Sequence, residues 1–239
     1  MKYLDLTFTD PATNLACDEA LLDYCESSDA GEVLRLWEPT DYFIVIGYSN
    51  KVSAEVNVPA CEAQKIPIYR RFSGGGAVLQ GPGCLNYSLV IKSEHVKSFH
   101  TIAESFKAVL ERHQKLFAQL LVEPVQIEGI SDLTIAGKKF SGNSQHRKLR
   151  YTLFHGTFLL NLDLWMVEAT LRMPSKEPRY RSHRTHAEFL KNLSVDGDSV
   201  RLKLKEEWAA VEKLPFLPGN GIQRAVQDRY SQHNWNFRF

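Results

Sequence analysis

The sequence predicts one mixed domain of the α+β (or α/β) class, in which helices flank a mixed, largely antiparallel sheet. Short runs of branched and aromatic residues mingle with helical patterns, and no internal repeat or low-complexity stretch separates them. A chain of 239 residues with 44% hydrophobic composition can bury one sizeable core. We therefore expect residues 1–239 to form a single domain.

The first half of the chain is predicted to alternate strands with two helices. Asp10-Pro11 combines an N-cap residue with proline at the first helical position, which predicts a helix from Pro11 to about Cys25. A short helix is expected over residues 56–64. Strands are expected over residues 3–8, 33–37, 42–48, 66–72, 77–80 and 84–91.

The second half begins with the clearest helical pattern, from Ile102 to about Leu121. His113 lies on its apolar stripe, and we interpret it as a core histidine rather than a catalytic one. Ala136-Gly137 is a predicted hairpin turn. Further strands are expected over residues 123–129, 131–137, 138–142 and 153–162, a basic loop over 172–186, and closing helices over 200–211 and 223–230.

The composition excludes several classes of protein. Lys and Arg total 29 against 28 Asp and Glu, so a net charge of +1 gives no global case for nucleic-acid binding. The four cysteines form no CxxC pair, which indicates reduced, buried thiols and no metal site. The stretch MKYLDLTFTD has acidic residues and no apolar core, so we expect it not to be a signal peptide. The longest apolar run, YFIVIGY, is too short to cross a membrane. We expect a cytoplasmic protein without membrane contact.

The stretch RRFSGGGAVLQGPGCLNYS, residues 70–88, is the least ordinary part of the sequence. Glycine permits positive φ and leaves room for a ligand, and consecutive N–H groups can form an anion-binding nest. Arginine adds donors whose geometry suits phosphate or carboxylate. The stretch lacks the GK[ST] of a Walker loop and the spacing of a dinucleotide loop. A glycine-rich hairpin without a ligand remains the alternative interpretation.

Read with the rest of the chain, this stretch resembles the first signature of lipoate–protein ligases, within the biotin and lipoate ligase superfamily. GKKFSGNSQ, residues 137–145, followed by HGTFLL, residues 155–160, resembles the second signature. NLACDEALL, LRLW and RYRSHRTHAEFLKNL are similar to further family segments and occur in the expected order. The Arg- and Gly-rich loop of biotin ligases is absent, which favours lipoate. The resemblance implies the ligase catalytic-domain fold.

The same resemblance implies the site residues. Lys139 is expected to contact both the acyl carboxyl and the α-phosphate, whereas Lys138 is expected to be a surface lysine. Arg71 and the segment Gly76, Ala77, Val78 and Leu79 are expected to line the nucleotide and acyl-adenylate pocket, which Gly74 and Gly75 allow the backbone to approach. Asn86 and Ser144 are plausible polar neighbours, and His155 is expected near the lipoyl pocket; for these three, structural hydrogen bonding is the alternative.

The implied reaction has two steps. Lipoate attacks the α-phosphate of ATP to give lipoyl-AMP, and a lysine of an acceptor lipoyl domain then takes the lipoyl group. Mg²⁺ is expected on the nucleotide phosphates, and no dedicated metal site is predicted. Many family members carry a further C-terminal domain. The resemblance therefore implies that adenylation uses either a separate accessory subunit or the short C-terminal region of this chain. Preference between lipoate and octanoate stays open.

Two other functions are compatible with the sequence. An octanoyltransferase of the same fold would use a cysteine thioester, but its usual position, three residues before HG, is Thr152, and no cysteine follows Cys84. A non-catalytic protein that binds lipoyl domains is the other alternative.

Two basic stretches could steer an acidic acceptor: residues 172–184, and the set Lys138, His146, Arg147, Lys148 and Arg150.

Overall fold

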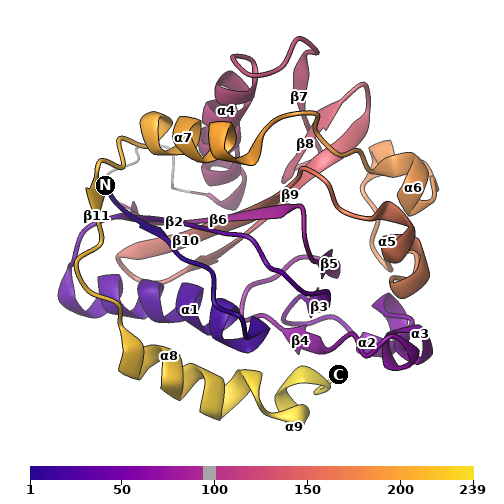
Figure 1. The fold of residues 1–239 in the computed structure, drawn as a ribbon, viewed down its shortest axis with the longest axis horizontal. Coiled ribbons are helices and arrows are strands. Elements are labelled where there is room, and N and C mark those ends of the chain that lie inside the picture. The colour runs from indigo at the N-terminus through magenta and orange to yellow at the C-terminus, as the bar shows by residue number, and fades with distance from the viewer. Residues whose placement is uncertain (94–100) are drawn as a thin grey trace.

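The structure, a computed structural model, describes residues 1–93 and 101–239 and consists of two sheets covered by helices (Figure 1). Eight strands form the large sheet and three form the small one. No helix in the described part of the chain is long and apolar enough to span a bilayer. The expected class, a mixed α+β domain with a largely antiparallel sheet, is confirmed.

The large sheet is antiparallel except at one edge, where β1 pairs in parallel with both of its neighbours. In spatial order its strands are β11 (Glu212–Lys213), β1 (Lys2–Asp5), β2 (Val33–Trp37), β6 (Cys84–Lys92), β10 (Tyr151–Leu159), β9 (Lys138–Arg147), β8 (Asp132–Ile135) and β7 (Val125–Glu128). The small sheet places β3 (Phe43–Ile46) between β4 (Ile68–Arg70) and β5 (Val78–Gln80).

Helices cover both faces of the large sheet. In Figure 1, α4 and α7 lie above the sheet and α1 and α8 lie below it. The main helices are α1 (Pro11–Ser28), α4 (Ile102–Phe117), α5 (Leu164–Thr170), α7 (Gly197–Glu207) and α8 (Gly219–Ala225). Shorter helical segments are α2 (Val52–Glu55), α3 (Val58–Ala63), α6 (His186–Phe189), α9 (His233–Asn236), a 3₁₀ turn η2 (Arg179–Arg181) and a π-helical turn η3 (Val226–Tyr230).

Strand β2 shows how the sequence divides the core into two layers. Leu34 and Leu36 pack on the face covered by α4 and α7, whereas Val33 and Trp37 pack on the face covered by α1 and α8. Between them Arg35 is fully buried, and its guanidinium pairs with Asp18 of α1 at 2.6 Å. A buried charge requires such a partner, so this pair fixes α1 against the sheet.

The small sheet builds a third apolar cluster at the side of the molecule. Ile44 and Ile46 of β3 pack there with Val167 and Leu171, which lie in and just after α5. The glycine-rich segment, residues 73–76, connects β4 to β5. This segment contacts the large sheet through Ser144 of β9 and His155 of β10.

Most expected elements are present, with differences at their ends. The N-cap of α1 is Asp10, as predicted, and Ala136 and Gly137 both have positive φ in the predicted hairpin turn. The strand expected over residues 138–142 continues to Arg147, because residues 141–147 pair with β10. The helix expected to reach about Leu121 ends at Phe117.

His113 is a buried core residue, as predicted. The indole Nε1 of Trp208 donates a hydrogen bond to its Nε2 (3.1 Å), and the rings of Tyr87 and Phe158 pack edge-on against it. Its Nδ1 has no partner among the described residues. Burial, aided by the nearby charge of Arg112, lowers the pKa of His113 to about 3.

This buried histidine makes stability depend on pH. Below about pH 6.5 the unfolded chain binds a proton that folded His113 does not, so stability falls as pH decreases toward 3. Each such group contributes about 1.4 kcal/mol per pH unit. We expect denaturant titrations at pH 7, 6 and 5 to show a shallower loss for His113→Gln than for wild type. His183→Gln, at an exposed position, is the control; equal slopes for all three proteins would contradict the prediction.

Candidate functional site

Arg71 shapes the glycine-rich segment from within. Its guanidinium is almost fully buried and donates to the carbonyl oxygens of Gly74 (2.7 and 2.9 Å) and Gly76 (2.9 Å). Burial lowers its pKa to about 10, which leaves it protonated near neutral pH. The side chain of Ser144 on β9 donates to the same Gly74 oxygen at 2.9 Å. The segment is therefore held in a fixed bend that turns its carbonyls inward.

Two glycines make this bend possible. Gly75 has φ of +94°, and a side chain there would meet the Arg71 guanidinium at 2.6 Å. Gly47, directly after β3, lies so close to the bend that an added Cβ would be 1.9 Å from the Gly75 oxygen. The glycine-rich segment thus packs backbone to backbone against the end of β3.

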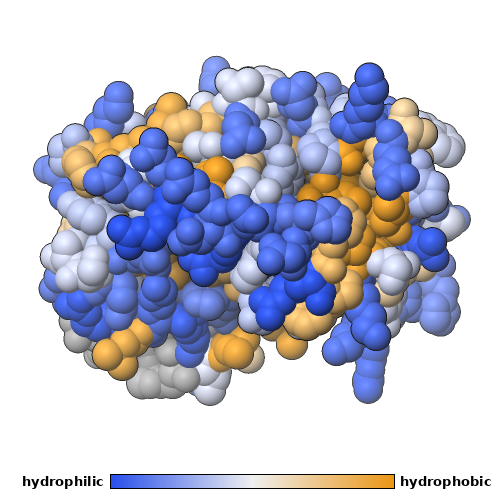
Figure 2. Space-filling model, turned by 90° about the horizontal axis from the view of Figure 1, so that it is seen from below, coloured by the Kyte–Doolittle hydropathy of each residue, from blue (hydrophilic) through white to orange (hydrophobic). Residues whose placement is uncertain are grey.

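Two adjoining cavities lie beside this segment. The larger, about 800 Å³, lies between it, the β8–β9 hairpin and residues 159–190, and much of its lining is apolar. Figure 2 shows a hollow with hydrophobic lining on the side of the molecule where α3 and α5 lie. The smaller, about 170 Å³, lies between the segment and the sheet. Both cavities share Gly76, Ala77, Val78, Gln80, Ser131, Lys139, Gly142 and Thr157.

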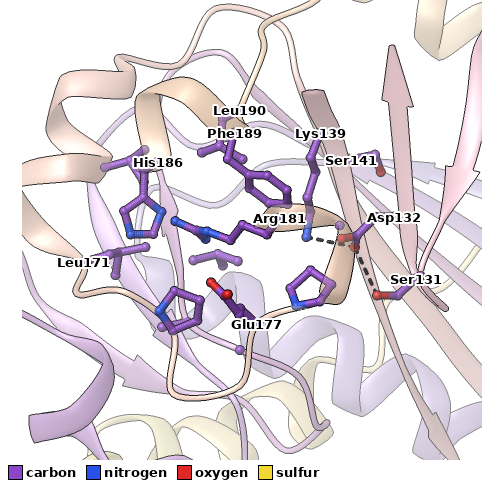
Figure 3. A pocket seen from close by; sticks show the side chains of 18 of the residues that line it. Ser131, Asp132, Lys139, Ser141, Leu171, Glu177, Arg181, His186, Phe189 and Leu190 are labelled. Carbon is purple, nitrogen blue, oxygen red and sulfur yellow. Dashed lines mark hydrogen bonds and ion pairs between the residues drawn. The ribbon is translucent and has the colours of Figure 1, made fainter. Parts of the chain in front are cut away.

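Lys139 lies where the two cavities meet. Its ammonium pairs with the carboxylate of Asp132 at 2.8 Å (Figure 3), and Asp132 is only 5% exposed. The β8–β9 pairing contains a bulge between Leu133 and Thr134, which shifts the register near Asp132. Gly142 completes the arrangement, because a Cβ there would lie 2.7 Å from the Lys139 Nζ. Because Gly142 has no side chain, the Lys139 side chain can lie over this part of β9 and reach Asp132.

Asn86, Thr157 and Gln80 form a closed hydrogen-bonding group beside the smaller cavity. Thr157 Oγ1 donates to Asn86 Oδ1 (2.5 Å), Asn86 Nδ2 donates to Gln80 Oε1 (2.8 Å), and Gln80 Nε2 donates to Thr157 Oγ1 (2.8 Å). His155 Nε2 lies 2.7 Å from Ser73 Oγ. Burial and the Arg71 charge lower the pKa of His155 to about 3, so it is neutral near pH 7.

The structure brings nearly all of the predicted site residues together. Lys139, Gly76, Ala77 and Val78 line both cavities, and Leu79 lines the larger one. The smaller cavity is also lined by Arg71, Gly75, Asn86, Ser144 and His155. Gly74 lines neither cavity, and its carbonyl serves as an acceptor within the bend.

Sequence reasoning missed several residues of the site. Asp132 carries no motif that marks it, although the predicted hairpin turn already placed its strand beside that of Lys139. Trp37 and Ser88 also line the smaller cavity, and their buried Nε1 and Oγ have no partner among the described residues. Unpartnered buried donors in a cavity wall are groups that a ligand could satisfy.

The charges expected to steer an acceptor divide into two groups. Lys148 pairs with Asp23 of α1, and Arg150 lies 3.9 Å from Glu26 of the same helix. Lys148 and Arg150 therefore have acidic partners on α1. In the other stretch, Lys176 and Arg179 are exposed, line the larger cavity and form no ion pair within the described residues.

The fold is that of the ligases that attach lipoate to proteins. In a bipartite lipoate protein ligase from Thermoplasma acidophilum, the matched chain superposes with a TM-score of 0.82 at 24% identity, over 99% of this chain and 95% of that one. Residues 10–204 match the model of the lipoyl protein ligase A/B catalytic domain, and the chain belongs to this family.

Relatives within the family carry two kinds of name. A probable lipoate-protein ligase A from Mycoplasma pneumoniae is 28% identical over 95% of this chain and 68% of its own length. An octanoyltransferase LipM from Carboxydothermus hydrogenoformans is 29% identical over 100% of this chain and 98% of its own. The chain is thus similar both to proteins named lipoate-protein ligases and to proteins named octanoyltransferases.

Because Gly47 touches the bend that borders both cavities, Gly47→Ala should be destabilising. We expect a loss on the order of 1–3 kcal/mol, the usual range for overpacking, and a fall in the thermal unfolding midpoint. Gly219→Ala is the control, since an added Cβ there meets no atom within 4 Å. Equal midpoints for the two variants would refute the close approach.

Proposed function

We propose that the protein is an ATP-dependent lipoate–protein ligase. The observation that carries the proposal is the Lys139 ammonium, fixed by a buried carboxylate at the junction of the two cavities. A fixed cation in a partly water-excluded site stabilises charge that develops on a phosphate or acyl oxygen. We also propose that residues 1–239 act as one catalytic domain.

The cavities suggest where each substrate binds. A volume of about 800 Å³ suits a nucleotide, within the range usual for ligand sites. The smaller cavity, walled in part by Leu15, Trp37 and Val45, suits the acyl chain. A lipoyl-AMP molecule would then have its mixed anhydride beside Lys139. ATP-bound lipoate-protein ligase A and lipoate-bound relatives share this fold, which supports the assignment.

The chemistry follows from this placement. The lipoate carboxylate oxygen attacks the α-phosphorus, the bond to the β-phosphate oxygen breaks, and pyrophosphate leaves. Lys139 compensates the charge that builds on the α-phosphate oxygens. In the second step the amine of an acceptor lysine attacks the acyl carbon, an amide forms, and AMP leaves with the electron pair of the broken C–O bond.

Mg²⁺ fits this site as a companion of the nucleotide. The described residues contain no group of three or more His, Cys, Asp or Glu side chains placed to hold a metal. Mg²⁺ needs only one or two carboxylates when phosphates supply its other ligands. Glu128 and Asp132 both line the larger cavity, and the ion would neutralise phosphate charge there.

The cysteines favour the ligase over a thioester-using octanoyltransferase, the second candidate suggested by the LipM relatives. A thioester mechanism needs an accessible thiol that ionises readily. All four cysteines are buried, and burial raises the pKa of Cys84, the one nearest the glycine-rich segment in sequence, to about 12. None of the four lines either cavity.

Lys139→Ala should abolish lipoyl transfer, because losing one such electrostatic contact costs about 3–4 kcal/mol in the transition state. The assay is mass spectrometry of a lipoyl domain incubated with the protein, lipoate, ATP and Mg²⁺. Lys138→Ala, at the exposed neighbouring lysine, is the matched control and should retain activity. Activity of Lys139→Ala within about threefold of wild type would overturn this role.

Two further substrates in the same assay separate the alternatives. Transfer from lipoyl-AMP, but not from lipoate plus ATP, would mean that adenylation needs a separate accessory subunit. Transfer from an octanoyl thioester without ATP would replace the ligase with an octanoyltransferase. Binding to the lipoyl domain without any transfer would indicate a non-catalytic protein.

Lys176 and Arg179 should matter for the protein acceptor. Exposed charges at the mouth of the larger cavity would raise the rate of encounter with an acidic lipoyl domain. We expect Lys176→Glu/Arg179→Glu to raise the acceptor KM several-fold and to weaken its salt dependence. Lys115→Glu/Lys213→Glu, exposed and away from both cavities, is the charge-matched control. A raised KM for ATP instead would assign these cations to the phosphates.

A further inference from the structure

The carboxylate that holds Lys139 has a second partner. Asp132 Oδ1 faces the ammonium at 2.8 Å and also accepts from Ser131 Oγ at 3.1 Å. Its other oxygen, Oδ2, accepts a hydrogen bond from the Tyr180 hydroxyl at 2.7 Å. Tyr180 lies 48 residues further along the chain, in the turn η2. The chain therefore closes a Lys–Asp–Tyr triad over the junction of the two cavities.

The Tyr180 side chain is itself firmly placed. Its ring packs on Phe189, with ring centroids 5.2 Å apart. Arg184 donates to the Tyr180 carbonyl oxygen (2.7 Å) and to that of Gly137 in the β8–β9 turn (3.0 Å). Tyr180 and Arg184 thus fasten residues 179–184 to both ends of the hairpin that carries Lys139.

This arrangement limits how Asp132 can hold the lysine. A carboxylate with both oxygens free can turn both toward an ammonium, whereas here the phenol engages Oδ2. One of the three N–H donors of Lys139 then binds Asp132, and the other two are available for oxygens of a substrate. We propose that Tyr180 is a positioning residue, which acts through Asp132 to keep the Lys139 donors directed toward the acyl-adenylate.

The proposal rests on the proposed ligase function for its consequence, but the positioning itself is a property of the protein alone. Figure 3 shows Lys139 and Asp132 on one wall of the larger cavity, with Phe189 and Arg181 on the facing wall. Tyr180 joins these two walls. Loss of its hydroxyl alone should leave the ring in the cavity wall and alter the direction of the lysine.

The chain supplies a matched control. Tyr151 donates to Asp29 at 2.6 Å, and Asp29 pairs with Lys92 at 3.4 Å. This second Lys–Asp–Tyr triad lies outside both cavities. Tyr151→Phe therefore removes the same kind of hydrogen bond without touching the site.

We expect Tyr180→Phe to lower kcat for adenylate formation about tenfold, because a hydrogen bond to a charged group is lost. KM for ATP and lipoate should stay within about twofold of wild type, since the cavity walls remain. Tyr151→Phe should leave kcat within about twofold and cost comparable thermal stability. A kcat for Tyr180→Phe equal to that of Tyr151→Phe, or a change confined to KM, would overturn the positioning role.

A second measurement does not depend on ligase activity. Lysine labelling by acetic anhydride, followed by mass spectrometry, reports how strongly each amine is engaged, with Lys138 as the internal reference. In Tyr180→Phe both Asp132 oxygens can face Lys139, so its labelling should slow about threefold relative to wild type. If wild type shows no ATP-dependent activity, the proposed function fails. Unchanged Lys139 labelling would separately reject the positioning of the lysine by Tyr180.

Discussion

Two neighbouring guanidinium groups, those of Arg70 and Arg71, hold together the backbone on which the site depends. Arg70 is fully buried and donates to the carbonyls of Gly47, Tyr48 and Asn50 after β3, and to those of residues 235 and 236. Arg71 binds the carbonyls of the glycine-rich bend. Carbonyl oxygens of irregular backbone inside a protein still need hydrogen-bond donors. Each arginine supplies the donors that backbone N–H groups would supply in a regular helix or sheet.

This scaffolding changes the role that the sequence suggested for the first signature. Arginines beside three glycines suggested direct recognition of a phosphate or carboxylate. In the structure Arg70, together with Nε and Nη2 of Arg71, donates to protein carbonyls. Arg71 still lines the smaller cavity, and Lys139, from the second signature, lies where the two cavities meet. The first signature thus forms a cavity wall that Arg71 holds in shape, and the second places a lysine at the junction of the cavities. Electrostatic stabilisation of this kind works best when the charge needs no rearrangement at the moment of reaction.

The class of the fold, the long helices, the hairpin turn and the clustering of motif residues were predictable, because each depends on local periodicity or on a family signature. The roles of Asp132 and Tyr180 were not predictable from the sequence. They depend on a β-bulge and on a hydrogen bond between two residues that are 48 positions apart. The edge strand β11 is two exposed residues without a pattern. The balance of Lys148 by Asp23 of α1 likewise appears only when distant segments meet.

The contact between Gly47 and Gly75 also restricts how such a site can be altered, in evolution or in a directed-evolution library. A side chain at Gly47 would collide with the Gly75 backbone, and one at Gly75 would meet the Arg71 guanidinium from a backbone with positive φ, so single substitutions in this wall are destabilising. The opposite wall of the larger cavity is built from side chains such as Leu162, Val167 and Leu171, which can be exchanged one at a time. If the larger cavity holds the nucleotide, as proposed, new nucleotide preferences are therefore more accessible from the α5 side.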